Sequence, residues 1–161
     1  MTTFWILVAK YFVALPLLIG AGLLLSLPRA RQKALLVFGV LAGVLALVFA
    51  RIGGYLYYDP RPFVVGHFTP LVAHAVDNGF PSDHVLLASA VAAVCMYFNR
   101  KLGLLLWGIV ALIAFARVYV GVHHTVDVLG SMLFSLIAAA VVYRVLGKRW
   151  PLFLAATTFQ S

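Results

Sequence analysis

The sequence predicts an all-α integral membrane protein, a helix bundle of about five transmembrane helices with one short interfacial helix. The first observation behind this fold class is composition: the chain has 161 residues, of which 65% are apolar and 10% are charged. A soluble domain carries about 25% charged residues. The second is that five segments are apolar and long enough, or nearly so, to cross a bilayer, which takes about 20 residues. The third is that most charged residues fall between these segments. A chain of this length has no room for a second domain, so we expect residues 1–161 to form one membrane-embedded domain.

The expected spans are residues 4–27, 34–58, 84–99, 102–120 and 125–147. Pro16 predicts a kink in the first span, because proline removes a helical hydrogen bond. No basic segment precedes this span, so we expect it to be retained rather than cleaved as a signal peptide. Gly39 and Gly43 give the second span a small-residue face, which favours close helix packing. The third span is short in apolar residues, and we expect its polar start at the membrane interface.

The distribution of charge predicts the orientation in the membrane. Eight of the twelve Lys and Arg residues lie in or beside the connections after the first and third spans and after the fifth span. All four acidic residues, Asp59, Asp77, Asp83 and Asp127, lie on the other side. Basic connections remain in the cytoplasm. We therefore expect a multi-pass protein of the cytoplasmic (inner) membrane, with its polar segments on the periplasmic or extracellular side and residues 150–161 at the inner interface. This topology accounts for most of the net charge of +8, so nucleic acid is not an expected partner.

The longest connection, residues 59–83, lies on the outer side. Apolar residues repeat at helical spacing over residues 71–76. A Thr-Pro pair at residues 69–70 is typical of a helix start, and an Asn-Gly pair at residues 78–79 is typical of a helix end. The pattern predicts a short amphipathic helix in the interface.

His123 and Asp127 are candidate catalytic residues. They are four residues apart at the start of the fifth span, so both side chains lie on one helical face. An aspartate that accepts from one imidazole nitrogen fixes the tautomer and leaves the other nitrogen free to attack. The alternative is a surface histidine with an ordinary first-turn aspartate. Arg117 is brought near by the short turn before His123, and a guanidinium there suits phosphate oxygens, although snorkelling to headgroups is also open. We interpret His124 as a loop or interface residue.

A second polar segment opens the third span with Ser82, Asp83 and His84. A helix N-terminus favours an anion, and Ser82 and Asp83 are also ordinary capping residues. His84 has a pKa suited to proton donation, unless it is an interfacial histidine without a task. Arg61 follows the second span between two prolines, which suits either a stiff phosphate clamp or a membrane anchor. Asp59 is interpreted as a loop acid or a local partner of Arg61.

The three segments together resemble the motifs of the type 2 phosphatidic acid phosphatase superfamily. Those motifs are Lys, six residues, Arg-Pro; then Pro-Ser-Gly-His; then Ser-Arg, five residues, His, three residues, Asp. The chain matches them in order and spacing at Arg61-Pro62, at Pro-Ser-Asp-His over residues 81–84, and at residues 116–127 with Ala-Arg in place of Ser-Arg. The Pro-Ser-Asp-His form is similar to that of the undecaprenyl-pyrophosphate phosphatases of the bacitracin-resistance type.

Three departures from the motifs concern the phosphate-binding residues. Gly54 stands where the family lysine falls, and Arg51, about one helical turn earlier, is the residue that would replace it. Ala116 removes the hydroxyl of the family serine, and Asp83 replaces the family glycine.

The resemblance implies a mechanism without a metal or cofactor. His123 would attack phosphorus to form a phosphohistidine, Asp127 would orient it, and His84 would protonate the leaving oxygen and then activate water. The residues expected to hold the phosphoryl groups are Arg61, Ser82, Arg117, Asp83 and Arg51.

The favoured substrate is a lipid pyrophosphate in the membrane, undecaprenyl pyrophosphate, which would be hydrolysed to the monophosphate. Phosphatidylglycerophosphate, phosphatidic acid and lipid A remain open as substrates, and so does a non-catalytic lipid-phosphate binder or transporter. The sequence leaves the oligomeric state open.

Overall fold

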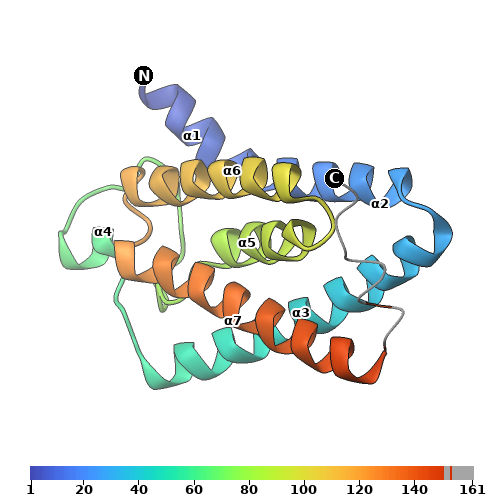
Figure 1. Cartoon of the computed structure of the whole chain (residues 1–161). Helices are drawn as coiled ribbons and strands as arrows, with labels where there is room; N and C mark the ends of the chain where they lie inside the picture. The colour runs from blue at the N-terminus through green and yellow to red at the C-terminus, as the bar shows by residue number, and fades with distance from the viewer. Residues whose placement is uncertain (151–152, 154–161) are drawn as a thin grey trace.

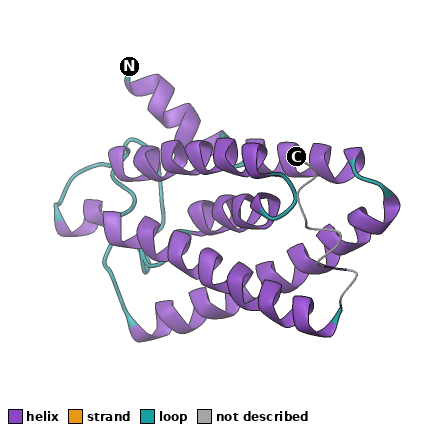
Figure 2. Ribbon diagram, viewed as in Figure 1, coloured by secondary structure: helices purple, strands orange, loops and turns teal. Residues whose placement is uncertain are grey.

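The computed structural model describes residues 1–150 and Phe153, and within them it contains seven helices and no strand (Figures 1 and 2). The helices are α1 (Thr2–Tyr11), α2 (Ala14–Ser26), α3 (Arg29–Leu56), α4 (Pro62–Val65), α5 (Asp83–Met96), α6 (Arg100–Tyr119) and α7 (Thr125–Arg149). The all-helical fold class is confirmed. Apart from Trp150 and Phe153, the tail expected at the inner interface lies outside the described residues.

The expected spans correspond to helices of three kinds. Helices α3, α6 and α7 are each long and apolar enough to cross a membrane. Helices α1 and α2 pass the same test only as a pair, which is bent by 48° and is either a broken span or a re-entrant loop. The bend precedes Pro16, which has no N–H to donate to the Phe12 carbonyl, and the amide of Leu15 donates to that carbonyl instead, at 3.0 Å. Helix α5 has 14 residues, which at 1.5 Å per residue is about 21 Å and shorter than a typical span.

Helix α5 is the centre of the bundle. It packs against α2, α3, α6 and α7, and Figure 1 shows it enclosed by them. Its buried residues include Ala88, Ala92 and Ala93, whose small side chains let the neighbouring helices approach closely. Ser89 satisfies its hydroxyl inside the core by donating to the Val85 carbonyl at 2.6 Å. A short helix suffices here because protein surrounds it on several sides.

The amphipathic helix predicted within residues 69–79 is not formed. This part of the connection consists of bends and irregular loop with one isolated bridge between Pro60 and Asn78, and the helix that the connection does contain is the single turn α4. Val72 is buried in a cluster with Val8 and Val122, and the amide of Leu71 donates to the Val120 carbonyl at 3.0 Å. Val72 therefore packs back onto α1 and the α6–α7 turn, whereas Leu71 and Val76 are exposed.

The polar segments gather at one end of the bundle. Figure 1 shows the α3–α5 connection and the α6–α7 turn at one end, and the α2–α3 turn and the end of α7 at the other. The turn after α6 reverses the chain at Gly121, whose φ of +80° is favoured by glycine. This turn brings Arg117 and His123 together, as the sequence predicted.

Candidate active site

Four parts of the chain meet in the candidate site. Arg61 precedes α4, Ser82 precedes α5, Arg117 lies in the last turn of α6, and His123 lies in the turn before α7, which contributes Asp127. None of these five residues is more than 5% exposed. Two hydrogen bonds fasten the start of α5 to α7, since Ser131 Oγ donates to the Ser82 carbonyl at 2.9 Å and the Ser82 amide donates to the Asp127 carbonyl at 3.4 Å. Buried charged groups are costly unless paired, so this concentration is a candidate functional site.

His123 is oriented by two acceptors at its Nδ1 atom. Asp127 Oδ2 lies 3.2 Å from Nδ1, and the carbonyl oxygen of Gly79 lies 3.0 Å from it. Both contacts require Nδ1 to carry the proton, which leaves the lone pair on Nε2. Asp127 Oδ2 is itself held by the amide of His124, which donates to it at 2.8 Å. The predicted pairing of His123 with Asp127 is present, and the Gly79 carbonyl is an orienting partner that the motifs do not include.

Two guanidinium groups flank the ring of His123. Arg117 Nη2 lies 3.4 Å from Nε2, and Arg61 Nη1 lies 3.1 Å from Nδ1 and 3.1 Å from Nε2. Arg61 Nη1 also donates to the Val122 carbonyl at 2.9 Å, which fixes it beside the ring. Burial lowers the pKa of His123 well below its usual range, and the charges of Arg117 and Arg61 lower it further. The imidazole is therefore uncharged at neutral pH, as a nucleophile requires.

Arg61 is paired with Asp77 and not with Asp59. Its Nε and Nη2 atoms lie 2.9 Å and 2.8 Å from Asp77 Oδ1. The sequence-based pairing of Arg61 with Asp59 is wrong, because the turns of residues 66–82 bring Asp77 back over Arg61. The same turns place the ring of His74 with its centroid 6.1 Å from that of His123.

Two buried donors at the site have no partner among the described residues. They are Ser82 Oγ and Arg117 Nε. Asp127 Oδ1 is a buried acceptor that likewise has no hydrogen-bond partner among these residues. Unsatisfied buried donors are rare in folded proteins and call for a ligand that accepts from them. An anion with several oxygens, such as a phosphoryl group, would satisfy both donors.

The remaining predicted residues lie at the rim of the site. His84 is half-buried in the first turn of α5 and interacts electrostatically with Arg117 and His74. Asp83 and Arg51 are exposed, and both line a pocket that also includes Arg61.

At Gly54, where the family has a lysine, the backbone of the segment that precedes α5 occupies the space that a side chain would need. A Cβ atom on Gly54 would lie 3.0 Å from the Phe80 carbonyl oxygen, and the Gly54 carbonyl accepts from Asn78 Nδ2 at 2.9 Å. A side chain at residue 54 would push α3 away from the segment that precedes α5. Arg51, one turn earlier, lines the pocket that also includes Arg61.

A second carboxylate–imidazole pair lies behind Asp127. His124 Nδ1 is 3.0 Å from Asp59 Oδ2, and ligand atoms of Asp59, His124 and Asp127 lie within 4.8 Å of one another. Such a set resembles a metal site, but the Asp59–His124 contact has the length of a hydrogen bond, which an ion would have to replace. Burial and the nearby Asp127 raise the pKa of Asp59. The sequence gives one indication of the Asp59–His124 pair: Asp59 lies two residues before Arg61, and His124 directly follows His123.

Comparison with known sequences shows the family of the chain. The PAP2 superfamily profile matches residues 32–151. Undecaprenyl-diphosphatase BcrC of Bacillus subtilis is 35% identical over 134 residues, which cover 82% of this chain and 67% of that protein. The bacitracin transport permease protein BcrC of Bacillus licheniformis is 32% identical over 136 residues, covering 83% and 64%. The chain thus spans about two-thirds of the length of these relatives.

Solved structures show the same fold. LpxE of Aquifex aeolicus superposes with a TM-score of 0.66 over 89% of this chain and 83% of that chain, at 24% identity. A PAP2-type phosphatidylglycerolphosphate phosphatase from Bacillus subtilis superposes with a TM-score of 0.60, over 92% and 75%, at 26% identity. With the profile match covering most of the sequence and the membrane bundle shared, the chain belongs to the PAP2 superfamily.

Proposed function

We propose that this protein is a membrane phosphatase that hydrolyses a polyprenyl pyrophosphate, with undecaprenyl pyrophosphate as the favoured substrate, to the monophosphate and phosphate. The observation that carries the chemistry is the environment of His123: its Nδ1 atom is held by Asp127 and Gly79, while Nε2 lies beside Arg117 and Arg61. The substrate choice is supported by the relatives named undecaprenyl-diphosphatase.

The proposed first step is attack by His123 Nε2 on the terminal phosphorus. An N–P bond forms while the bond from phosphorus to the bridging oxygen breaks, and protonated His84 gives its proton to that oxygen. Arg61, Arg117 and the hydroxyl of Ser82 hold the three equatorial oxygens. Their positive charge and buried donors stabilise the charge of the transition state without requiring an ion there. Asp127 stabilises the cationic imidazole that results.

The proposed second step releases phosphate. Neutral His84 takes a proton from water, the new P–O bond forms, and the N–P bond breaks, which returns the lone pair to Nε2. His84 is protonated again and ready for the next cycle. This exchange of roles needs one histidine that remains bonded to Asp127 and a second whose ring is not tied down. Within the described residues, the His84 side chain makes no hydrogen bond.

The proposed location is the inner membrane, with the site facing the periplasm or cell exterior. The basic connections and the candidate site lie at opposite ends of the bundle (Figure 1), which supports this orientation through the positive-inside rule.

Phosphatidylglycerophosphate is a second candidate substrate, because one relative and one superposed structure are named for it. Phosphatidylglycerophosphatase B of Bacillus subtilis is 36% identical over 81 residues, and the second superposed structure is named as a phosphatase of phosphatidylglycerolphosphate. The deciding experiment measures phosphate release by the purified protein in lipid nanodiscs from undecaprenyl pyrophosphate, phosphatidylglycerophosphate, phosphatidic acid and lipid A. The proposal expects the highest kcat/KM for undecaprenyl pyrophosphate. A higher value for any other lipid would reject the substrate assignment.

The nucleophile is tested by His123→Ala, with His67→Ala as the matched control. His67 is an exposed histidine in the same end of the protein and takes no part in the site. We expect His123→Ala to abolish phosphate release and His67→Ala to retain it. Acid-labile, base-stable ³²P on the wild-type chain during turnover would identify the phosphohistidine. Release at the wild-type rate by His123→Ala would reject the mechanism.

A further inference from the structure

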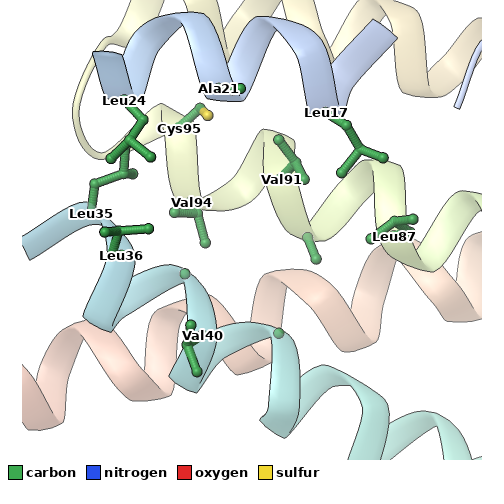
Figure 3. Close-up of a pocket in the computed structure, with 14 residues that line it drawn as sticks. Leu17, Ala21, Leu24, Leu35, Leu36, Val40, Leu87, Val91, Val94 and Cys95 are labelled. Atoms are coloured by element: carbon green, nitrogen blue, oxygen red, sulfur yellow. The ribbon is translucent and has the colours of Figure 1, made fainter. Parts of the chain in front are cut away.

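An apolar groove runs along one side of the central helix. It has a volume of about 330 Å³ and is lined by residues of α2, α3 and α5. Figure 3 shows Leu17, Ala21 and Leu24 of α2 on one side and Leu36 and Val40 of α3 on the other, with the side chains of α5 between them.

The floor of the groove is widened by glycines on α3. A Cβ atom on Gly43 would meet nothing within 4 Å, and one on Gly39 would meet only Val94 Cγ1 at 3.8 Å. The close helix packing predicted for these glycines is therefore wrong: they leave space instead of filling it. Because Gly39 and Gly43 also line the groove, the missing side chains leave room in it for a ligand.

A second hollow lies nearer the candidate site along the same two helices. A polar pocket at the site end of α3 and α5 is lined by Leu47, Arg51, Arg61 and Asp83 among others. Leu47 lies one helical turn beyond Gly43 of the groove. On α5, Asp83 lies one turn before Leu87, which lines the groove. The two hollows are thus separated by about 6 Å of helix, the rise of four residues.

We infer that this groove binds the prenyl chain of the substrate. The phosphate that stays on the lipid then lies in the polar pocket beside Arg51, and the terminal phosphoryl group lies beyond Arg61, whose Nη1 atom is 3.1 Å from both ring nitrogens of His123. The assignment rests on the proposed function and adds to it the site of the lipid tail. A lipid pyrophosphate has a charged head joined to an apolar chain. The polar pocket matches the head, and the apolar groove farther along the same helices matches the chain. The assignment also gives Arg51 a role, which is to hold the phosphate that stays on the lipid.

Binding of the prenyl chain to the groove must depend on how closely the two surfaces fit. A lipid tail leaves an apolar bilayer to enter an apolar groove, so burial alone contributes little and close packing decides the affinity. The methyl branches of a prenyl chain can fill the spaces above Gly39 and Gly43, whereas an unbranched acyl chain leaves them empty. The groove therefore favours a branched chain.

The test fills the groove. Gly39→Leu and Gly43→Leu place a side chain in open space without meeting backbone, and leucine is a better helix former than glycine. The matched controls are Gly22→Leu and Gly108→Leu, because a Cβ atom at either residue also meets nothing within 4 Å and neither lines the groove. Each variant is purified in nanodiscs, its thermal unfolding is measured, and kcat/KM is determined for undecaprenyl pyrophosphate and for the much shorter geranyl pyrophosphate.

The expected result is a roughly three- to tenfold fall in the ratio of kcat/KM for the long chain over the short chain in Gly39→Leu and Gly43→Leu, with the wild-type ratio kept in both controls. An unchanged ratio in the groove variants, with wild-type hydrolysis intact, overturns the groove assignment and leaves the proposed function standing. Absence of polyprenyl pyrophosphate hydrolysis by the wild type overturns both. An equal fall in the ratio for long- over short-acyl phosphatidic acid shows that the groove takes any chain, which overturns the preference for a prenyl chain.

Discussion

Replacing Asp127 with asparagine separates the two tasks of this carboxylate. The asparagine side chain has the same shape, and its amide oxygen can accept from the His124 amide and from His123 Nδ1 as Asp127 does now, at 2.8 Å and 3.2 Å. The hydrogen bonds are kept and the negative charge is lost. The tautomer of His123 is also secured by the Gly79 carbonyl, 3.0 Å from Nδ1. The substitution therefore removes mainly the electrostatic stabilisation of a cationic imidazole.

The size of that stabilisation follows from the distance. Two unit charges 3.2 Å apart interact by about 5 kcal/mol at an effective dielectric constant of about 20. If about half of the charge has developed on the imidazole in the transition state, the loss is about 2.5 kcal/mol. This is roughly a 70-fold reduction in kcat. The assay is phosphate release from undecaprenyl pyrophosphate at saturating substrate, with thermal unfolding as a check on folding.

Two outcomes would refute this reasoning. A loss below about fivefold would mean that the carboxylate does not stabilise charge on His123. A loss of about 10⁴-fold would match the removal of a tautomer-fixing aspartate and would mean that the Gly79 carbonyl does not hold Nδ1–H. As a control, Asp127→Asn should have no further effect in a protein that already carries His123→Ala, because the two residues act as a unit.

Four further predictions concern the same site. Asp77→Asn should lower KM by roughly two- to fivefold, because its half-exposed carboxylate competes with phosphate for Arg61; an unchanged KM would show that the pair does not hinder binding. Gly79→Ala should lower kcat by roughly 10- to 100-fold, because the new Cβ would lie 2.9 Å from Asp127 Oδ2 and displace it; kinetics like those of the wild type would contradict this packing. The NMR signal of His123 should remain that of a neutral imidazole from about pH 8 down to about pH 5, since burial and two arginines lower its pKa; a midpoint near the ordinary histidine value of about 6.5 would be the opposite result. Incubation with a strong chelator should leave phosphate release unchanged, because Arg61 and its neighbours supply the positive charge; full loss of activity, restored by a divalent cation, would reassign the Asp59–His124–Asp127 cluster as a metal site.

Local patterns in the sequence predicted the parts of the site that depend on neighbours in the chain. The spacing of His123 and Asp127 within one helical turn, and the short turn after Arg117, are enough to bring these three together. The start of α5 near residues 82–84 could also be predicted from the sequence, because capping residues precede an apolar run.

The features that were not predicted depend on contacts between distant segments. Residues 71–76 have helical periodicity, but Val72 packs onto Val8 and Val122, which no local pattern shows. The pairing of Arg61 with Asp77 in place of Asp59 has the same origin, since it requires the turns of residues 66–82 to fold back.

The contact between Arg61 and Asp77 has a consequence for product release. A buried guanidinium without a counter-ion is costly, yet Arg61 lies 2.8 Å from a carboxylate only 16 residues further along its own chain. We expect this carboxylate to replace phosphate at Arg61 when the product departs, so that the guanidinium is never left without a counter-ion. The tethered group competes at a high effective concentration with free phosphate. Orthophosphate should therefore be a weak product inhibitor, and turnover can continue where phosphate accumulates.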